Sequence, residues 1–241
     1  MIKDVLKVYE NTTDLSEGFT RFILNDILKG DRKINIALSG GTTPKVVFDY
    51  WAAKYKNIIP WDRILFFWGD ERCVPPDNNM NNYAMTKEHL FDKVDVPNNN
   101  IFRIHGENEP EEEAVWYSKV LQSRLPLEND VPVFDLIILG LGDDGHTASI
   151  FPQQINLWDS PKNCVVAEHP ESKMKRVSVT GKIINSARNV VFLATGDKKS
   201  EKVQQIIKHR KDFTDKYPAA RVAPKNQQLY WFLDKAAAEL L

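Results

Sequence analysis

The segment LGLGDDGHTASIFP contains the residues with the most evident chemistry. Asp144 and His146 lie two positions apart on a glycine-rich stretch that follows a strongly apolar run. A carboxylate beside an imidazole can orient the ring and stabilise its protonated form, and a free imidazole titrates near neutral pH. The pair therefore has the residue types of a general base, although one histidine among five is weak evidence by itself.

The same segment contains a literal G-x-G-x-x-G pattern, formed by Gly140, Gly142 and Gly145. This pattern indicates a dinucleotide site when it follows a strand and opens a crossover helix. A strand is expected before it, but Pro152 interrupts the chain soon afterwards and the next stretch is not convincingly amphipathic. The sequence therefore disfavours dinucleotide binding and leaves a loop that presents Asp144 and His146.

A second polar segment, SGGTTP, begins with Ser39, Gly40, Gly41 and Thr42. Two glycines after a strand let the backbone turn and expose N–H groups, and a helix that starts near Pro44 directs its positive end to the same place. Such a turn can bind phosphate without a cationic side chain. An ordinary tight turn before a capped helix would have the same sequence, so this segment alone leaves both interpretations open.

Residues 37–41, ALSGG, also resemble the G-x-S-x-G nucleophile elbow, with alanine in place of the first glycine. An elbow needs a helix directly behind the serine, whereas the helix here is expected to start only at Thr43-Pro44. A serine nucleophile is therefore disfavoured. It predicts that Ser39→Ala abolishes activity, whereas a binding role for Ser39 predicts mainly weaker substrate binding.

Cationic side chains follow three further strand candidates. Arg72 lies in GDERCVPP, Arg176 opens RVSVTGK, and Lys198 and Lys199 lie in TGDKKSEKV. A guanidinium can bind phosphate or carboxylate through two hydrogen bonds. Lysines in the first turn of a helix oppose the helix dipole, and an anionic ligand would remove that conflict. Solvated loops with local ion pairs would have the same composition, so only the combination of these segments indicates an anion-binding site.

Short apolar runs alternate with helix-like segments along the chain and precede the polar segments. This alternation predicts an α/β fold with an open, mainly parallel sheet and helices on both faces. Ligands bind such sheets beyond the carboxyl ends of the strands, where these polar segments would lie. Strands are expected at 34–38, 64–68, 101–104, 133–139, 164–167, 176–179, 190–194 and 229–233, and helices at 14–29, 44–56, 83–93, 110–124, 198–209 and 236–241.

Two helix starts have specific expected caps. Asp14 is expected to begin the first helix, with Glu17 as its capping-box partner, and Thr43 is expected to cap the helix that follows SGGT. Pro44 suits the first position of that helix. These caps would fix where each helix begins.

Bulk composition limits the function classes. The 241 residues fit one large domain or two small ones, with 42% hydrophobic and 27% charged residues. A net charge of −1 argues against nucleic acid or an anionic membrane as the main partner. No signal peptide or apolar run of about 20 residues is expected to direct the chain into a membrane. Cys73 and Cys164 form no CxxC pattern, which favours a reducing, cytoplasmic compartment. The oligomeric state stays open.

Taken together, the segments resemble the glucosamine-6-phosphate isomerase/6-phosphogluconolactonase superfamily over nearly the whole chain. The loop around His146 is the most specific feature. The deaminase branch has an aromatic residue where this chain has Arg72, and its histidine loop continues to Asn-Glu-Pro where this chain has 148–152, ASIFP. Asp143 is a small departure from the usual pattern. The segments that look like the lactonase branch are GDERCVPP, Asn82-Tyr83, LGLGDDGHTASIFP, RVSVTG, TGDKKSEKV, PAARV and LYWFLDKAAA.

The resemblance implies a modified Rossmann-like sheet in one domain, residues 1–241, without a metal or other cofactor. It also implies hydrolysis of a small sugar-phosphate lactone, 6-phospho-D-glucono-1,5-lactone, in the pentose phosphate pathway. His146 would act as the general base, with Asp144 as its partner. The residues assigned to substrate binding are Ser39, Gly40, Gly41, Thr42, Arg72, Arg176 and Lys199.

The expected mechanism starts from neutral His146, which takes a proton from water as the water attacks the lactone carbonyl. Arg72 and Lys199 are expected to bind phosphate, but either could instead stabilise the oxyanion, and the sequence leaves both roles open. Two other functions remain. A related deaminase would release ammonia from glucosamine 6-phosphate. A sugar-phosphate sensor would usually need a DNA-binding helical segment, for which this chain has neither spare length nor basic charge.

Overall fold

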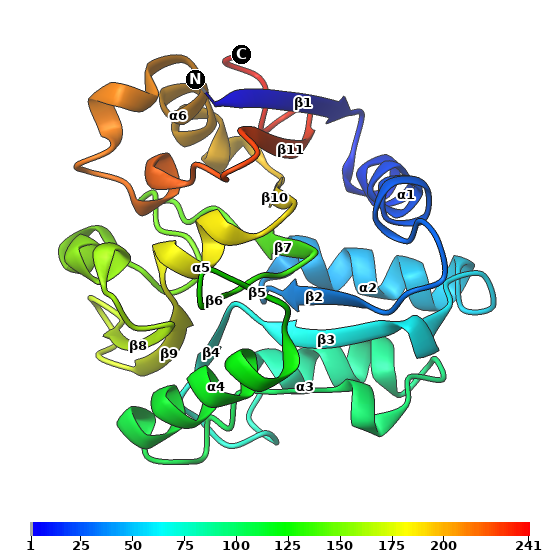
Figure 1. Cartoon of the computed structure of the whole chain (residues 1–241). Coiled ribbons are helices and arrows are strands. Elements are labelled where there is room, and N and C mark those ends of the chain that lie inside the picture. Colours follow the sequence, from blue (N-terminus) through cyan, green and yellow to red (C-terminus); the bar gives the residue numbers. More distant parts are fainter. Residues whose placement is uncertain (1) are drawn as a thin grey trace.

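A six-stranded parallel sheet forms the centre of the computed structural model, which describes residues 2–241 (Figure 1). The strand order is β1-β11-β10-β7-β2-β3, and all paired neighbours are parallel. The predicted α/β fold is confirmed. The strands are β1 (Lys3–Tyr9), β2 (Ile34–Leu38), β3 (Ile64–Trp68), β7 (Leu136–Leu139), β10 (Val190–Ala194) and β11 (Gln228–Asp234).

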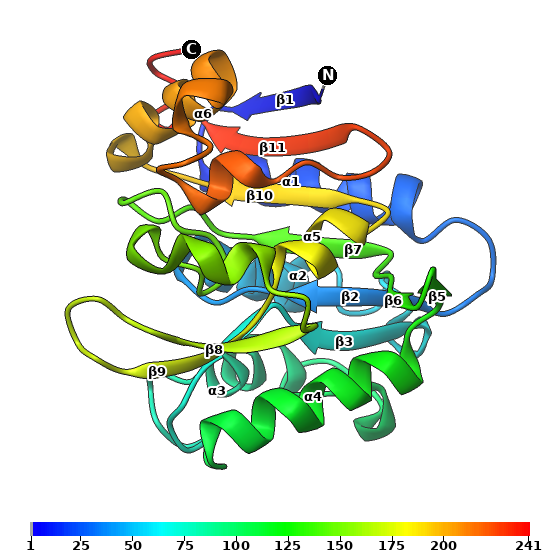
Figure 2. The same ribbon diagram turned by 60° about the vertical axis from the view of Figure 1, so that its left-hand side comes forward.

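Helices cover both faces of this sheet. In Figure 2, α1 and α2 lie behind the strands and α4 and α5 lie in front of them. Strands β2, β7 and β10 are accordingly buried at every position. The α-helices are α1 (Thr12–Phe22), α2 (Thr42–Lys54), α3 (Asn82–Thr86), α4 (Pro110–Arg124), α5 (Gly181–Ser186) and α6 (Ser200–Phe213). No helix within residues 2–241 combines the length and apolarity needed to cross a membrane.

A smaller antiparallel sheet lies beside the main one, in the order β4-β9-β8. It consists of β4 (Asp70–Arg72), β8 (Cys164–Glu168) and β9 (Lys175–Val179). The strands predicted at 164–167 and 176–179 therefore exist, but they do not join the parallel sheet. Gly69 alone separates β3 from β4, so the chain leaves the main sheet there and enters the small one. A hairpin pairs β5 (Leu127–Glu128) with β6 (Val131–Pro132).

Several predicted elements differ from the structure. The edge strand β1 was not predicted, and residues 101–104 form only one bridge, between Ile101 and Phe66. The region predicted as the strand 133–139 is regular only in β7. Residues 235–240 form turns instead of a terminal helix, because a segment this short cannot offset the cost of starting a helix.

The predicted helix caps are also wrong. The side chain of Asn11, not Asp14, caps α1 by accepting a hydrogen bond from the Asp14 amide at 3.0 Å. Glu17 instead accepts hydrogen bonds from Tyr50 of α2 and from Tyr55, the residue after that helix. Helix α2 starts at Thr42, one residue earlier than the predicted cap, and the Thr43 hydroxyl pairs with the hydroxyl of Thr195 at 2.7 Å. The helix start therefore depends on the glycine turn before it.

Candidate active site at the carboxyl ends of the strands

A pocket of about 200 Å³ lies where β2, β3, β7 and β10 end. This is the edge of a parallel sheet at which ligands bind. Apart from Asp144, all of the predicted site residues line it, and Asp144 contacts one of the lining side chains. The predicted residues that line the pocket are Ser39, Gly40, Gly41, Thr42, Arg72, His146, Arg176 and Lys199.

His146 and Asp144 form a hydrogen-bonded pair. The Oδ1 atom of Asp144 lies 2.6 Å from Nδ1 of His146 and also accepts the His146 backbone N–H at 3.0 Å. Burial raises the pKa of Asp144, but the hydrogen bond and the charge of His146 outweigh it, and the pKa falls below its usual value. An ionised Asp144 that accepts from Nδ1–H leaves the lone pair on Nε2, the arrangement that a general base needs.

Two glycines of the same loop are needed for its conformation, and one of them makes this pair sterically possible. A Cβ atom added to Gly142 would lie 2.1 Å from Nδ1 of His146 and 2.6 Å from Oδ1 of Asp144. Gly145 has a φ of 88°, and a Cβ there would lie 2.5 Å from the Tyr217 ring. Close packing against the imidazole thus explains Gly142, and the positive φ and the Tyr217 ring explain Gly145. The segment that follows the pattern, Pro152–Asp159, is a 3-10 helix and not a crossover α-helix.

Phe151 separates the imidazole from a buried guanidinium. Its ring centroid lies 4.8 Å from that of His146, and the guanidinium carbon of Arg176 lies 5.4 Å from the Phe151 centroid. Phe151 is 1% exposed. It belongs to the 148–152 segment, which has no carboxylate, so this segment supplies an apolar contact to the histidine ring.

Two arginines are neighbours on adjacent strands of the small sheet. Arg72 of β4 and Arg176 of β9 are paired in register, and both line the pocket. Arg72 donates from Nη1 to the carbonyl of Met80 at 2.6 Å, while Nε of each arginine is buried without a hydrogen-bond partner in residues 2–241. Burial lowers the pKa of Arg176; the charge of Asp70 opposes this, and the nearby charge of Arg72 adds a smaller lowering. An anion beside both guanidiniums would offset their mutual repulsion.

The remaining anion-binding groups come from two helix starts. Gly41 has a φ of 107° and forms the N-cap of α2, whose first N–H groups have no partners within the helix. Lys199 lies in a 3-10 turn, Asp197–Lys199, directly before α6, and it forms an ion pair with Asp143 at 2.5 Å. Lys198 does not line the pocket. A negative ligand would meet polar groups on three sides.

The sequence predictions assigned no site role to three polar residues of the pocket, Asp70, Asn82 and Thr195. Asp70 is 5% exposed and accepts a hydrogen bond from the Ser149 hydroxyl at 2.6 Å. Asn82 donates from Nδ2 to the Asp70 carbonyl at 2.9 Å. Strand periodicity could have identified Asp70, because residues 70 and 72 of an extended segment share one face. Asn82 lies in one of the segments that carry the family resemblance, but nothing in the sequence around it indicates its contact with Asp70.

Comparison with known proteins gives consistent matches. A family model described as glucosamine-6-phosphate isomerases/6-phosphogluconolactonase matches residues 11–231. A 6-phosphogluconolactonase of Treponema pallidum is 42% identical over 189 residues, 78% of each chain. One from Haemophilus influenzae is 43% identical over 209 residues, 86% of this chain and 88% of that one. The solved structure of 6-phosphogluconolactonase from Trypanosoma brucei is 32% identical, covers both chains completely and has a TM-score of 0.86.

Proposed function

The chain belongs to the family of glucosamine-6-phosphate isomerases and 6-phosphogluconolactonases, and from this premise we propose that it hydrolyses 6-phospho-D-glucono-1,5-lactone. The product is 6-phospho-D-gluconate, and the reaction is a step of the pentose phosphate pathway. Similarity to the named lactonases of two bacteria and a trypanosome supports the substrate. The proposal includes the cytoplasm as the compartment and residues 1–241 as one domain.

The contact between Asp144 and His146, at the edge of a pocket rich in anion-binding groups, is the observation that carries the mechanism. His146 accepts a proton at Nε2 from a water molecule as the water oxygen attacks the lactone carbonyl carbon. The resulting imidazolium keeps its Nδ1–H directed at the Asp144 carboxylate, which stabilises the new charge. A positioned base of this kind accelerates a reaction by about 10²–10⁴-fold.

The tetrahedral oxyanion then collapses, and the bond to the ring oxygen breaks. The imidazolium can return its proton to that oxygen, so the histidine ends the cycle in its starting form. Lactones of this type are activated esters and need no covalent nucleophile, which leaves Ser39 a binding role. No step requires a metal or other cofactor in this proposal.

The phosphate is assigned to the pair formed by Arg72 and Arg176, to Lys199 and to the 39–42 turn. Two guanidiniums with unpaired Nε–H groups match the donor demand of a dianion, because each can give two parallel hydrogen bonds. The lactone carbonyl then lies toward His146. If Arg72 instead contacted the oxyanion, it would contribute to the transition state more than to binding.

Deamination of glucosamine 6-phosphate is the second candidate function. The family contains such enzymes, and the pocket groups suit any sugar phosphate. Phe151 disfavours it, because an apolar ring covers the part of the imidazole where the deaminase branch supplies a carboxylate. No observation in the described residues specifically favours a sugar-phosphate sensor.

The test is a coupled assay in which freshly prepared lactone is converted and the 6-phosphogluconate formed is oxidised by its dehydrogenase. We expect the protein to accelerate hydrolysis far above the spontaneous rate and to release no ammonia from glucosamine 6-phosphate. Hydrolysis at only the spontaneous rate would reject the proposed function. Ammonia release without lactone turnover would favour the deaminase.

A further inference from the structure

Glu71 is a buried carboxylate next to the pocket, and the proposed mechanism does not use it. It lies between two pocket residues, Asp70 and Arg72, on β4. Because side chains alternate along a strand, Glu71 points away from the pocket. Its side chain is 0% exposed. Burying a carboxylate is costly unless its oxygens have hydrogen-bond donors, so its contacts indicate why the residue is there.

Three backbone N–H groups donate to this carboxylate. The Oε1 atom accepts from Asn82 at 2.6 Å and from Arg72 at 2.8 Å, and Oε2 accepts from Tyr83 at 2.8 Å. The carboxylate therefore joins β4 to the first residues of α3. The intervening loop, residues 73–81, is closed by these hydrogen bonds.

The residues held by Glu71 contact two anion-binding parts of the pocket. Asn82 packs on the glycine turn, since a Cβ atom added to Gly40 would lie 1.9 Å from Oδ1 of Asn82. Met80, in the loop that Glu71 closes, offers its carbonyl to Nη1 of Arg72. One buried carboxylate thus holds both Asn82, which packs on the 39–42 turn, and Met80, which accepts from the Arg72 guanidinium.

We propose that Glu71 is a positioning residue, which holds the phosphate-binding groups of the pocket in place through Asn82 and Met80 without touching the substrate. The inference rests on the proposed function, because it takes the pocket to bind a phosphorylated lactone. According to this proposal, Glu71 affects the affinity for the substrate and not the rate of the chemical step. Loss of the carboxylate should therefore raise KM and leave kcat nearly unchanged.

The ionisation of Glu71 gives a second readout. Burial raises the pKa of Glu71 to about 7, and the charge of Asp70 adds to this, although the three backbone donors lower it. The other titratable or charged groups that interact with it are Arg72 on its own strand, Cys73, Tyr117 of α4 and Arg176 of β9.

The ionised carboxylate accepts from all three N–H groups in charge-assisted hydrogen bonds, which weaken when the carboxylate is protonated. Protonation below about pH 7 should therefore loosen α3 and raise KM. The effect on stability has the opposite sign. Because the pKa is higher in the folded state than the ordinary value of 4.5, the contribution of Glu71 to folding stability is complete below pH 4.5 and is lost as pH rises through about 7. The ionised form thus costs stability while it completes the pocket.

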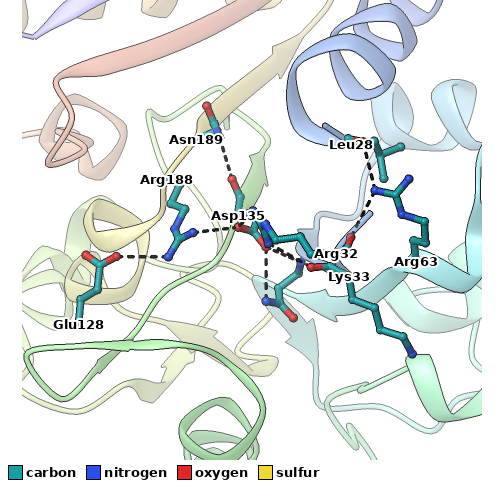
Figure 3. Close-up of polar contacts among 9 residues, drawn as sticks. Leu28, Arg32, Lys33, Arg63, Glu128, Asp135, Arg188 and Asn189 are labelled. Atoms are coloured by element: carbon teal, nitrogen blue, oxygen red, sulfur yellow. Dashed lines mark hydrogen bonds and ion pairs between the residues drawn. The ribbon is translucent and has the colours of Figure 1, made fainter. Parts of the chain in front are cut away.

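The experiment compares Glu71→Gln with Asp135→Asn. Asp135 is the matched control, because it is also a buried carboxylate, 3% exposed, but lies at the opposite ends of the strands. It accepts a hydrogen bond from the Asn35 backbone amide and forms an ion pair with Arg32 (Figure 3). We expect Glu71→Gln to raise KM about tenfold with kcat within about twofold, as for one lost charged hydrogen bond. Asp135→Asn should lower stability and leave KM unchanged.

Two further measurements separate positioning from general destabilisation. Amide hydrogen exchange at Asn82 and Tyr83 should accelerate in Glu71→Gln and not in Asp135→Asn. Below pH 7, the KM of the wild type should rise more steeply than the KM of Glu71→Gln. Protonation of the substrate phosphate affects both proteins, whereas protonation of the Glu71 carboxylate affects only the wild type. If Glu71→Gln does not fold, the wild-type profile is compared with that of Glu71→Asp, one methylene shorter.

Unchanged KM in a folded Glu71→Gln variant would overturn the inference, as would equal losses of kcat and kcat/KM or a wild-type KM that follows the substrate phosphate alone. Failure of the proposed function is a separate result. In that case the wild type itself would not hydrolyse the lactone, while the hydrogen-exchange comparison would still report whether Glu71 holds α3.

Discussion

At the scale of single residues, the site depends on two pairs of side chains, one joined by a hydrogen bond and one of like charge. The Asp144 carboxylate lies 2.6 Å from His146 Nδ1. Arg72 and Arg176 are paired in register on β4 and β9, and both line the pocket. The first pair forms the general base, and the second pair forms a binding place for an anion. Each can be removed by one substitution, and the two substitutions should affect different kinetic constants.

Replacing Asp144 with asparagine should lower kcat by about 10²-fold with little change in KM. The amide no longer stabilises the imidazolium and no longer fixes the tautomer that leaves Nε2 free. The measurement is steady-state lactone hydrolysis, corrected for the spontaneous rate. Asp49→Asn is the matched control, because Asp49 contacts His89 at 2.9 Å outside the pocket. An Asp144→Asn variant as fast as this control would contradict the role of Asp144.

Replacing Arg72 with alanine should raise KM by about tenfold or more and change kcat less, because the lost hydrogen bonds to phosphate are present before and during the reaction. Arg188→Ala, at an arginine that is 43% exposed and pairs with Glu128, provides the control. Equal reductions of kcat and kcat/KM would instead place Arg72 on the oxyanion, and the phosphate assignment would then be wrong.

At the scale of elements, the long apolar strands were predictable and the edges were not. Strands β3 and β10 are uninterrupted apolar runs, β2 is interrupted only by Asn35, and the ends of these strands located most of the pocket. Strand β1 is half-exposed and mixes charged with apolar residues, so its pattern gave no strand prediction. Which polar residues face the pocket depends on how β4 leaves the main sheet, a tertiary feature, and this is why Asn82 was missed.

The loop between β7 and the Pro152–Asp159 turns shows the same limit. Its glycine spacing imitates a nucleotide-binding pattern, and the only reasons to reject that pattern in the sequence are Pro152 and the weakly amphipathic stretch after it. The structure supplies the physical reason for Gly142, which is the imidazole packed against its Cα. The function of a glycine could not be derived before the neighbouring ring was located.

Gly142→Ala should therefore reduce kcat more than about tenfold, because the new methyl group must displace His146 or Asp144 from their contact. Gly69→Ala serves as a control in an adjacent strand end, since its Cβ would meet only the Leu38 carbonyl at 3.7 Å. Lactone assays on both variants, with melting temperatures, are the measurement. Full activity in Gly142→Ala would show that the pair tolerates displacement.

At the scale of the whole molecule, the two ends of the described chain lie in one sheet. Strand β1 pairs with β11 along seven residues, and Figure 1 shows both ends at the same side of the molecule. Asp4 of β1 accepts hydrogen bonds from Arg210 of α6 at 2.6 Å and from Trp231 of β11 at 2.8 Å. Burial raises the pKa of Asp4, although both partners lower it. These contacts support the proposal of one domain.

Asp4→Ala should lower the free energy of unfolding by about 2–4 kcal/mol, because it leaves Arg210, which is 16% exposed, without its carboxylate. Urea unfolding followed by circular dichroism and by tryptophan fluorescence should give one coincident transition. Glu10→Ala, which removes an exposed pair with Lys235, should change stability by less than about 1 kcal/mol. Two separate transitions in the wild type would contradict the single domain.

The most direct test of the whole account is kcat for lactone hydrolysis by His146→Ala, measured beside His89→Ala. His89 also pairs with an aspartate, but it lies outside the pocket. The account predicts a fall of about 10²–10⁴-fold for His146→Ala and wild-type kcat for His89→Ala. A folded His146→Ala variant that retains the wild-type kcat would contradict the assignment of His146 as the base that activates water.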